Sequence, residues 1–167
     1  MARRVDANDH SDLERLVIEI VPFEPEHAAE FAALVRDTLR EFGFEPDPEL
    51  DRDLDDPAGT YAALWIALAG GVVVGSIALR DLGGDAYMLK RMYLRSACRG
   101  RGVGKQLLAT ALDWTRANRG RVVRLDTTDR MVAARHLYES VGFAQVPGEG
   151  PPRQGQRRLL YELTIRV

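Results

Sequence analysis

A short basic loop rich in glycine separates an apolar run from a long amphipathic pattern, at residues 92–105 (MYLRSACRGRGVGK). The amphipathic pattern begins at Val103 and predicts a helix that starts directly after the loop. The start of a helix presents backbone N–H groups without partners and the positive end of the helix dipole. Together with the cationic side chains of the loop, these groups favour phosphate. The rest of the chain is therefore expected to hold a reactant beside a phosphate-bearing ligand.

Spacing separates three known phosphate loops. A Walker A loop is excluded, because Arg99 stands at its first Gly position and Gln106 at its Ser/Thr position. The dinucleotide fingerprint G-x-G-x-x-G is excluded, because Lys105 stands where its last Gly is required. The third pattern, Arg/Gln-x-x-Gly-x-Gly/Ala, is matched in full by Arg99, Gly102 and Gly104.

The third pattern is that of an acetyl-CoA pyrophosphate loop, and the chain resembles the GCN5-related N-acetyltransferase (GNAT) family. The segment LKRMYL at residues 89–94 is similar to the family's strand that leads into this loop. The segment ARHLYESVGF at residues 134–143 is similar to the family's A-x-x-LYE-x-x-GF segment. The matched blocks occupy the second half of the chain in the family's order.

The resemblance implies how acetyl-CoA is bound. The loop would contact the pyrophosphate, and backbone groups of Met92 and Leu94 would pair with pantetheine as an added strand does. A backbone N–H near Met92 or Tyr93 would polarise the thioester carbonyl. Tyr138 would be the general acid that protonates the leaving thiolate. The implied cofactor-binding residues are Met92, Tyr93, Leu94, Arg99, Gly100, Arg101, Gly102, Val103, Gly104, Lys105, Met131, Ala134 and Tyr138.

Two positions depart from the family pattern. Met88 stands where the family often has an acidic residue that acts as general base. Met131 stands where an Asn commonly opens the last helix and contacts the cofactor. The base is therefore unassigned. Its candidates are Glu41, Glu45, Tyr87, His136, a water chain held by backbone groups, or an amine already deprotonated in solution.

Several positions allow a structural as well as a functional interpretation. By helical spacing alone, Tyr138 would pack in the core with its hydroxyl bonded, whereas the surrounding LYESVGF favours the acid role. Phe42 and Phe44 would either border the acceptor site or close the core at a helix end. Cys98 is interpreted as a small loop residue rather than a nucleophile, because no base is evident near it in the sequence.

The length and composition bound the class of protein. The 167 residues, 46% of them hydrophobic, suit one domain over residues 1–167. Residues 1–16 are polar and charged, and are expected to form a frayed or accessory extension without a secretory signal. Charges interrupt every apolar stretch, so no membrane association is expected. The single cysteine excludes an internal disulfide and fits a reducing, cytoplasmic location.

Charge is unevenly distributed along the chain. The net charge of −2 gives no support to a nucleic-acid partner. Acidic residues gather at 41–56 and basic residues at 90–135. The basic stretch suits a polyanionic cofactor. The acidic stretch allows two interpretations, a solvated helix face or a site that favours a cationic, amine-bearing substrate.

Hydrophobic periodicity and turn residues predict the order of the elements. The first half is predicted as a strand over 17–21, a helix from Pro25 to Gly43, a short helix between 48 and 54, and a hairpin of strands 61–69 and 72–79 joined by Gly70-Gly71. The second half is predicted as a strand over 87–94, a helix from Val103 closed by Gly120, a strand over 122–125, a helix capped within 126–129 and ended by Gly142, and strands over 143–146 and 159–167 separated by a Gly- and Pro-rich loop.

This order predicts an α/β (α+β) fold: a mixed, largely antiparallel sheet of six or seven strands with helices on both faces. The resemblance implies that a central parallel pair of strands splays apart beside the phosphate loop. The implied activity is direct acetyl transfer from acetyl-CoA to a primary amine of a small molecule, amino acid or protein. No metal is expected, and a homodimer is expected because related proteins are often dimers.

Two other functions fit the same sequence. A non-catalytic acyl-CoA-binding sensor or interaction module would explain the missing acid at Met88. A toxin-like enzyme that acetylates aminoacyl-tRNA would need a positive overall charge for phosphate contacts, which the chain lacks. Coenzyme A release with any amine would exclude the non-catalytic module. An RNA-binding test would distinguish the enzyme that acetylates aminoacyl-tRNA.

Overall fold

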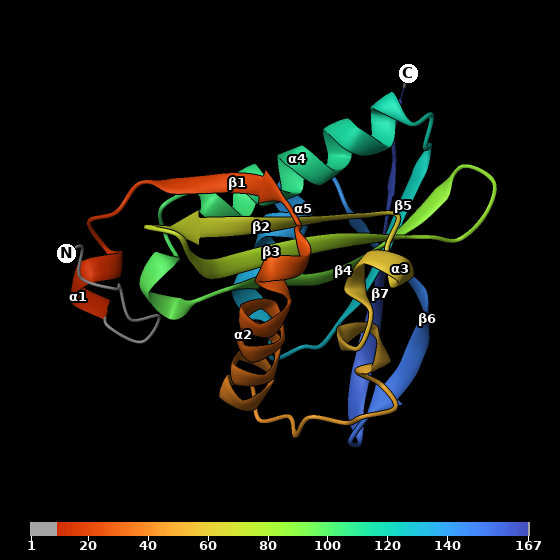
Figure 1. The fold of residues 1–167 in the computed structure, drawn as a ribbon. Coiled ribbons are helices and arrows are strands. Elements are labelled where there is room, and N and C mark those ends of the chain that lie inside the picture. Colours follow the sequence, from red (N-terminus) through yellow and green to blue (C-terminus); the bar gives the residue numbers. More distant parts are fainter. Residues whose placement is uncertain (1–9, 167) are drawn as a thin grey trace.

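The computed structural model describes residues 10–166, which form one seven-stranded sheet flanked by helices (Figure 1). The helices and 3₁₀ turns are α1 (His10–Leu13), η1 (Pro25–His27), α2 (Ala28–Glu41), η2 (Arg52–Leu54), α3 (Pro57–Thr60), η3 (Ser96–Cys98), α4 (Val103–Ala117) and α5 (Val132–Ser140). The strands are β1 (Ile18–Pro22), β2 (Ala63–Ala69), β3 (Val72–Asp81), β4 (Ala86–Leu94), β5 (Val122–Thr127), β6 (Ala144–Arg153) and β7 (Gln156–Thr164).

The strand order is β1-β2-β3-β4-β5-β7-β6, and every neighbouring pair is antiparallel except β4 and β5. Consecutive hairpins join β2, β3 and β4, and Gly70 and Gly71 both take the positive φ that the tight turn between β2 and β3 needs, whereas β1 reaches β2 through α2. The parallel pair requires a crossover, which α4 supplies. The expected mixed, largely antiparallel sheet with helices on both faces is confirmed.

The parallel pair is joined for only part of its length. The register runs from Ala86–Val122 to Met88–Arg124, although β4 continues to Leu94. Beyond Met88, no described strand pairs with the side of β4 that faces β5. The sheet therefore opens at its centre, which confirms the splayed pair that the resemblance implies.

The two faces of the sheet carry separate cores. On one face, α4 buries an apolar stripe, consisting of Val103, Leu107, Leu108, Ala111 and Leu112. On the opposite face, α2 buries another, consisting of Phe31, Leu34, Val35 and Leu39. Alternation along β2 serves both cores, because Trp65 and Ala67 face α4 whereas Leu64 and Ile66 face α2. Figure 1 shows the two helices on either side of the strands.

The end of α4 differs from its prediction. The residue in the left-handed conformation is Arg119 (φ 61°), and Gly120 does not take a positive φ. Gly120 is required for another reason: a Cβ there would collide with Cγ2 of Thr115 and lie 2.9 Å from the ring of Tyr87. The glycine therefore permits close approach of the chain to β4 rather than a left-handed cap.

Three further boundaries differ from the sequence prediction. Residues 126–127 belong to β5, and α5 starts after Met131 without a side-chain cap. The Gly- and Pro-rich stretch at 147–156 is not a loop, because it continues β6 through two register shifts into the hairpin with β7. The short helix expected at 48–54 is reduced to the 3₁₀ turn η2. For the two strand boundaries, pairing with a distant strand overrides the local turn signal.

The segment before β1 is anchored to the rest of the chain. Leu13 is fully buried in the core on the α4 face, and Leu16 packs against that core. The expectation of a frayed segment over 1–16 therefore does not hold for these two residues, and residues 1–9 lie outside the described part of the chain. Within residues 10–166, no helix has the length and apolar character needed to cross a membrane.

Candidate functional site

The loop between β4 and α4 forms an open cradle of backbone. Gly100 and Gly102 take φ values of 74° and 79°, which L side chains rarely adopt. A Cβ at either position would meet no atom within 4 Å, so the space beside both glycines is open. The first turn of α4 begins after the N-cap residue Gly102 and has no side-chain cap, so its N–H groups are not satisfied by a capping side chain. The arrangement suits an anion at this helix end.

Arg99, expected to face the pyrophosphate, is held from several sides. Its Nε donates to the carbonyl oxygen of Leu94 at 2.9 Å, and its guanidinium forms an ion pair with Glu41. The guanidinium carbon also lies 5.7 Å from the ring centroid of Phe42. Leu94, expected to pair with pantetheine, thus has its carbonyl engaged by the loop.

Arg101 and Lys105 differ in their partners. Arg101 donates to the carbonyl oxygens of Leu13 and Leu16, at 3.0 and 2.6 Å, and so ties the loop to the segment before β1. Lys105 is exposed in the first turn of α4, and no ion pair joins it to a described residue. Lys105 is therefore a cation at the loop that a ligand can use.

A cavity of about 430 Å³ opens where β4 and β5 part. Four of the predicted site residues line it: Met92, Tyr93, Met131 and Tyr138. The remaining lining comes from α2, the segment 44–61, three strands (β3, β4 and β5), the residue after β5, and the β6–β7 hairpin. In chain order these residues are Leu39, Phe44, Glu49, Leu50, Arg52, Asp53, Tyr61, Arg80, Leu89, Lys90, Arg91, Leu125, Asp126, Thr127, Thr128, Pro152, Arg153 and Arg158. The loop over 99–105 does not line the cavity. Ala134 packs on the core of the α4 face.

Tyr138 lines the cavity and packs its ring on the core. Its side chain is 5% exposed, and its ring lies edge-on against Phe143 with centroids 5.8 Å apart. Burial, reinforced by the neighbouring Tyr93 and Asp126, raises the pKa of the Tyr138 hydroxyl above its ordinary value. Such a phenol stays protonated at neutral pH and has a proton to donate.

The four side chains suggested as general base lie outside the cavity. Glu41 is paired with Arg99, and His136 is exposed on α5. Tyr87 is buried against Trp114, with ring centroids 5.4 Å apart. Glu45 lies beside the cavity, where its backbone carbonyl accepts from the β6–β7 hairpin. None of the four therefore lines the cavity that Tyr138 lines.

Two acids of the segment 41–56 are buried in ion pairs rather than solvated. Arg91 donates from Nε to Asp53 at 2.8 Å, and from a terminal nitrogen to Asp53 at 2.6 Å and to Asp51 at 2.9 Å. Tyr61 also donates its hydroxyl to Asp53. Arg91 is placed by a bulge in β4: it takes a positive φ of 50°, and the buried Ser76 hydroxyl donates to its carbonyl oxygen at 2.7 Å.

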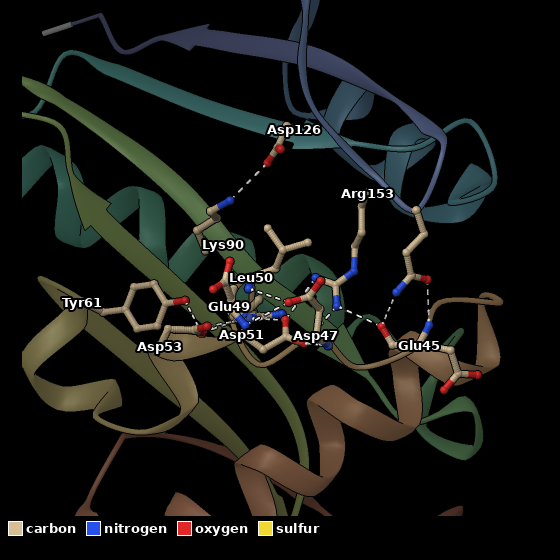
Figure 2. Close-up of polar contacts among 12 residues, drawn as sticks. Glu45, Asp47, Glu49, Leu50, Asp51, Asp53, Tyr61, Lys90, Asp126 and Arg153 are labelled. Atoms are coloured by element: carbon tan, nitrogen blue, oxygen red, sulfur yellow. Dashed lines mark hydrogen bonds and ion pairs between the residues drawn. The ribbon is translucent and has the colours of Figure 1, made fainter.

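Arg153 reaches Asp51 from β6. It donates to both oxygens of Asp51, at 3.0 and 2.9 Å (Figure 2). Burial tends to raise the pKa of Asp51, but hydrogen bonds from Arg153, the Asp47 N–H and Arg91, with the charge of Arg91, lower it to about 2. The two carboxylates and two guanidiniums balance in charge. This cluster closes one side of the cavity.

Asp126 forms a second cluster at the end of β5. Its Oδ1 lies 3.4 Å from Nζ of Lys90, and its Oδ2 lies 2.8 Å from a terminal nitrogen of Arg158. Figure 2 shows the Lys90 side chain directed across the gap between β4 and β5 toward Asp126. Here one carboxylate faces two cations, so the cluster has an excess of positive charge.

The sequence patterns do not single out these charged residues as site residues. Lys90 and Arg91 are adjacent cations inside a strand that is otherwise apolar, which is a signal of buried pairing or function. Asp126, expected among the caps of the last helix, instead ends a strand at the splay. Cys98, by contrast, is fully buried, and burial raises the pKa of its thiol, which agrees with a structural role.

Comparison with known proteins identifies one family. The acetyltransferase (GNAT) family profile matches residues 28–143. An N-alpha-acetyltransferase RimI from Mycobacterium tuberculosis is 33% identical over 122 residues, covering 71% of this chain and 68% of that protein. An N-acetylaspartate synthetase from Danio rerio is 34% identical over 112 residues, covering 62% of this chain but 39% of that longer protein.

Solved structures share the fold. An acetyltransferase of the GNAT family from Staphylococcus aureus Mu50 has a TM-score of 0.81 at 22% identity, covering 90% of this chain and 100% of that one. The PaiA N-acetyltransferase from Thermoplasma acidophilum, in complex with coenzyme A, has a TM-score of 0.73 at 16% identity, with coverage of 90% and 100%. At these identities the likeness concerns the fold alone. Among residues 10–166, no group of three or more histidine, cysteine or acidic side chains is placed to hold a metal ion.

Proposed function

The chain belongs to the acetyltransferase (GNAT) family, and we propose that it transfers an acetyl group from acetyl-CoA directly to a primary amine of a small molecule, amino acid or protein. The observation that carries the proposal is that β4 connects the open centre of the sheet to the glycine loop. β4 runs along the open centre of the sheet and leads into the glycine cradle at the start of α4. A relative named as an N-alpha-acetyltransferase supports the reaction class.

The residues present fit the cofactor. The open backbone at Gly100 and Gly102 and the uncapped first turn of α4 would receive the pyrophosphate, with Lys105 supplying a cation. The side of β4 beyond Met88 has no strand partner among the described residues, so backbone groups there would be available to the amides of pantetheine, apart from the carbonyls of Arg91 and Leu94, which Ser76 and Arg99 engage. A structural neighbour solved with coenzyme A supports this use of the fold.

Acetyl-CoA supplies an activated acetyl thioester, and the chain supplies position and a proton. A backbone N–H of β4 near Met92 or Tyr93 would polarise the carbonyl as developing negative charge appears on its oxygen. The acceptor nitrogen forms the new C–N bond while the C–S bond breaks. Tyr138 then gives its proton to the leaving sulfur and regains one released by the amine. Its raised pKa keeps the hydroxyl protonated until that step.

Holding both reactants in one cleft supplies much of the acceleration, because direct transfer needs no nucleophile from the chain. None of the suggested base side chains lines the cavity, which favours the two remaining candidates, an amine already deprotonated in solution or proton transfer through water. This arrangement predicts that the rate rises with pH as the free-amine fraction of the acceptor increases.

A thiol-release assay with acetyl-CoA and a panel of amines and amino acids tests the proposal. Coenzyme A release that depends on an added amine, with the N-acetylated product identified by mass spectrometry, is the expected result. Tight coenzyme A binding without release across the panel would instead favour the alternative, a non-catalytic acyl-CoA sensor. The absence of both binding and release would refute the assignment of the loop.

A further inference from the structure

The lining of the cavity includes buried polar atoms that have no partner among the described residues. They are the hydroxyl oxygens of Thr127 and Thr128 and the Nε atoms of Arg153 and Arg158. Thr127 and Thr128 are 4% and 2% exposed, and all four residues line the cavity. A buried polar group without a hydrogen bond is energetically unfavourable. Groups of this kind gathered around one cavity indicate a ligand that would satisfy them.

The two guanidinium groups require a partner that accepts hydrogen bonds. A guanidinium Nε–H is a donor and never an acceptor, whereas a threonine hydroxyl can donate one hydrogen and can also accept, so it suits such a partner too. The complementary ligand group therefore presents several lone pairs and few hydrogens. A carboxylate meets this requirement, since its two oxygens accept only. An ammonium group does not, since it has hydrogens alone.

The net charge of the Asp126 cluster also favours an anionic ligand. The cluster at Asp126 holds one carboxylate against the cations of Lys90 and Arg158, whose side chains are 29% and 19% exposed. Arg80 also lines the cavity, lies 5.8 Å from the ring centroid of Tyr61, and has no ion pair with a described residue. Burial lowers the pKa of Lys90, and the charges of Arg158 and Arg80 lower it further while Asp126 opposes them.

The buried acids of the Asp51 cluster add no compensating negative charge to the cavity. Asp51 and Asp53 are fully engaged by Arg91 and Arg153, two carboxylates against two guanidiniums. The acidic segment that suggested a cationic substrate from the sequence is therefore neutralised at these two positions inside the structure. What remains uncompensated at the Asp126 cluster is positive.

We propose that the acceptor of the acetyl group is a small amine that also carries a carboxylate, an amino acid rather than a diamine or a neutral amine. This inference rests on the proposed N-acetyltransferase function. The carboxylate is held by Lys90 and Arg158 with the hydroxyls of Thr127 and Thr128, and the amino group is directed to Tyr138, which lines the same cavity. A cavity of about 430 Å³ suits a molecule of this size.

Matched acceptor pairs test the proposal. Free glycine, alanine, aspartate and glutamate are compared with the corresponding carboxamides and with a diamine, using coenzyme A release by the wild-type chain. Amidation removes the charge that strengthens the hydrogen bonds to the carboxylate, so kcat/KM is expected to fall about tenfold to a hundredfold from at least one acid to its amide. Equal or better use of the amides or of the diamine would overturn the proposal and leave the acetyltransferase function standing.

Variants test whether Arg158 and Lys90 make the chain prefer an amino acid to its amide. Arg158→Gln is expected to reduce the ratio of acid to amide kcat/KM toward one, and Arg158→Lys to restore part of it. Arg157→Gln is the matched control, because Arg157 is one residue away and pairs with Glu149 at the surface, with 70% of its side chain exposed. Unchanged coenzyme A affinity in each variant verifies that the fold is kept. A ratio that survives Arg158→Gln and Lys90→Met would contradict the assignment.

Binding measured without turnover tests the carboxylate site separately from the proposed acetyltransferase activity. Isothermal titration of each amino acid and its amide into the chain with coenzyme A bound, and into the chain alone, reports the carboxylate contact directly. If coenzyme A binds and no amine is acetylated, selective binding of the acid still supports the site. If neither acids nor amides bind, or both bind equally, the carboxylate site is refuted whatever the activity.

Discussion

Arg99 and Glu41 form a two-point ion pair that joins the loop after β4 to the end of α2. Two terminal nitrogens of Arg99 lie 2.5 and 2.8 Å from the two carboxylate oxygens of Glu41. The arginine that matches the pyrophosphate pattern is thus neutralised by a residue 58 positions away. Its guanidinium supports the shape of the loop, and its charge is partly withheld from a ligand.

Glu41→Gln is expected to strengthen coenzyme A binding. The substitution leaves the charge of Arg99 uncompensated beside the loop, and a half-exposed pair of this kind is worth up to about 1 kcal/mol, or about fivefold in Kd. The gain should shrink at high salt, where screening is stronger. Titration calorimetry at low and high ionic strength measures it, with Glu162→Gln as the control because that acid pairs with Arg124 on another part of the sheet. Weaker coenzyme A binding in Glu41→Gln would show instead that the ion pair is needed to hold the loop in its binding conformation.

Gly102→Asp is expected to abolish coenzyme A binding. The new side chain would enter the open space beside the cradle and bring negative charge to it, in addition to the strain of a φ of 79°. Gly83→Asp is the control: it imposes the same change at a φ of 88°, also in open space, in the turn at the other end of β4. Equal losses of affinity in the two variants would point to backbone strain rather than the phosphate cradle.

Tyr138→Phe is expected to lower kcat by about a hundredfold to ten-thousandfold while coenzyme A affinity stays within about twofold. The variant keeps the ring that packs on Phe143 and removes the proton donor. Tyr161→Phe removes a hydroxyl that bonds Glu139 and Arg135 away from the cavity, and should keep wild-type kcat. Because the pKa of Tyr138 is raised, kcat of the wild type should not decline with loss of this proton as pH rises through about 10. Wild-type turnover in Tyr138→Phe would remove the acid role.

Asp51→Asn is expected to destabilise the fold by about 3–5 kcal/mol, because it leaves Arg153 buried without its carboxylate partner. Urea unfolding measures the change. Asp113→Asn, which breaks an exposed pair with Arg116 on α4, should cost less than about 1 kcal/mol.

The ion pair of Asp51 and Arg153 predicts that the stability of the fold depends on pH. The pKa of Asp51 is lowered from 3.8 to about 2 in the folded chain, so folding favours the ionised form. This contribution is complete above about pH 4 and is lost as pH falls toward 2. The difference in unfolding free energy between wild type and Asp51→Asn should therefore narrow over that range. A difference that stays constant down to pH 2 would exclude the ionised pair as its source.

Local patterns determined much of the fold. Gly70 and Gly71 both take the positive φ that the hairpin requires, and the helical period of Phe31, Leu34 and Val35 matches the buried face of α2. The phosphate-loop pattern lies, as predicted, between β4 and the start of α4. These features could be predicted because each depends on the dihedral angles and side-chain spacing of a few consecutive residues. Cofactor contacts, a homodimer and a cytoplasmic location stay predictions.

Tertiary structure alone decided the composition of the cavity. Asp51 meets Arg153 across 102 residues, and Asp126 meets Lys90 across 36, because the fold places β6 beside the segment before η2 and places β4 beside β5. The sequence shows an acidic stretch and a basic stretch, but it does not show which charges cancel. Pairing between distant residues depends on the relative placement of whole strands, which no local pattern encodes. The sequence by itself therefore predicted the scaffold and the reaction class it resembles, and the tertiary structure decided which of its charges pair with one another around the cavity.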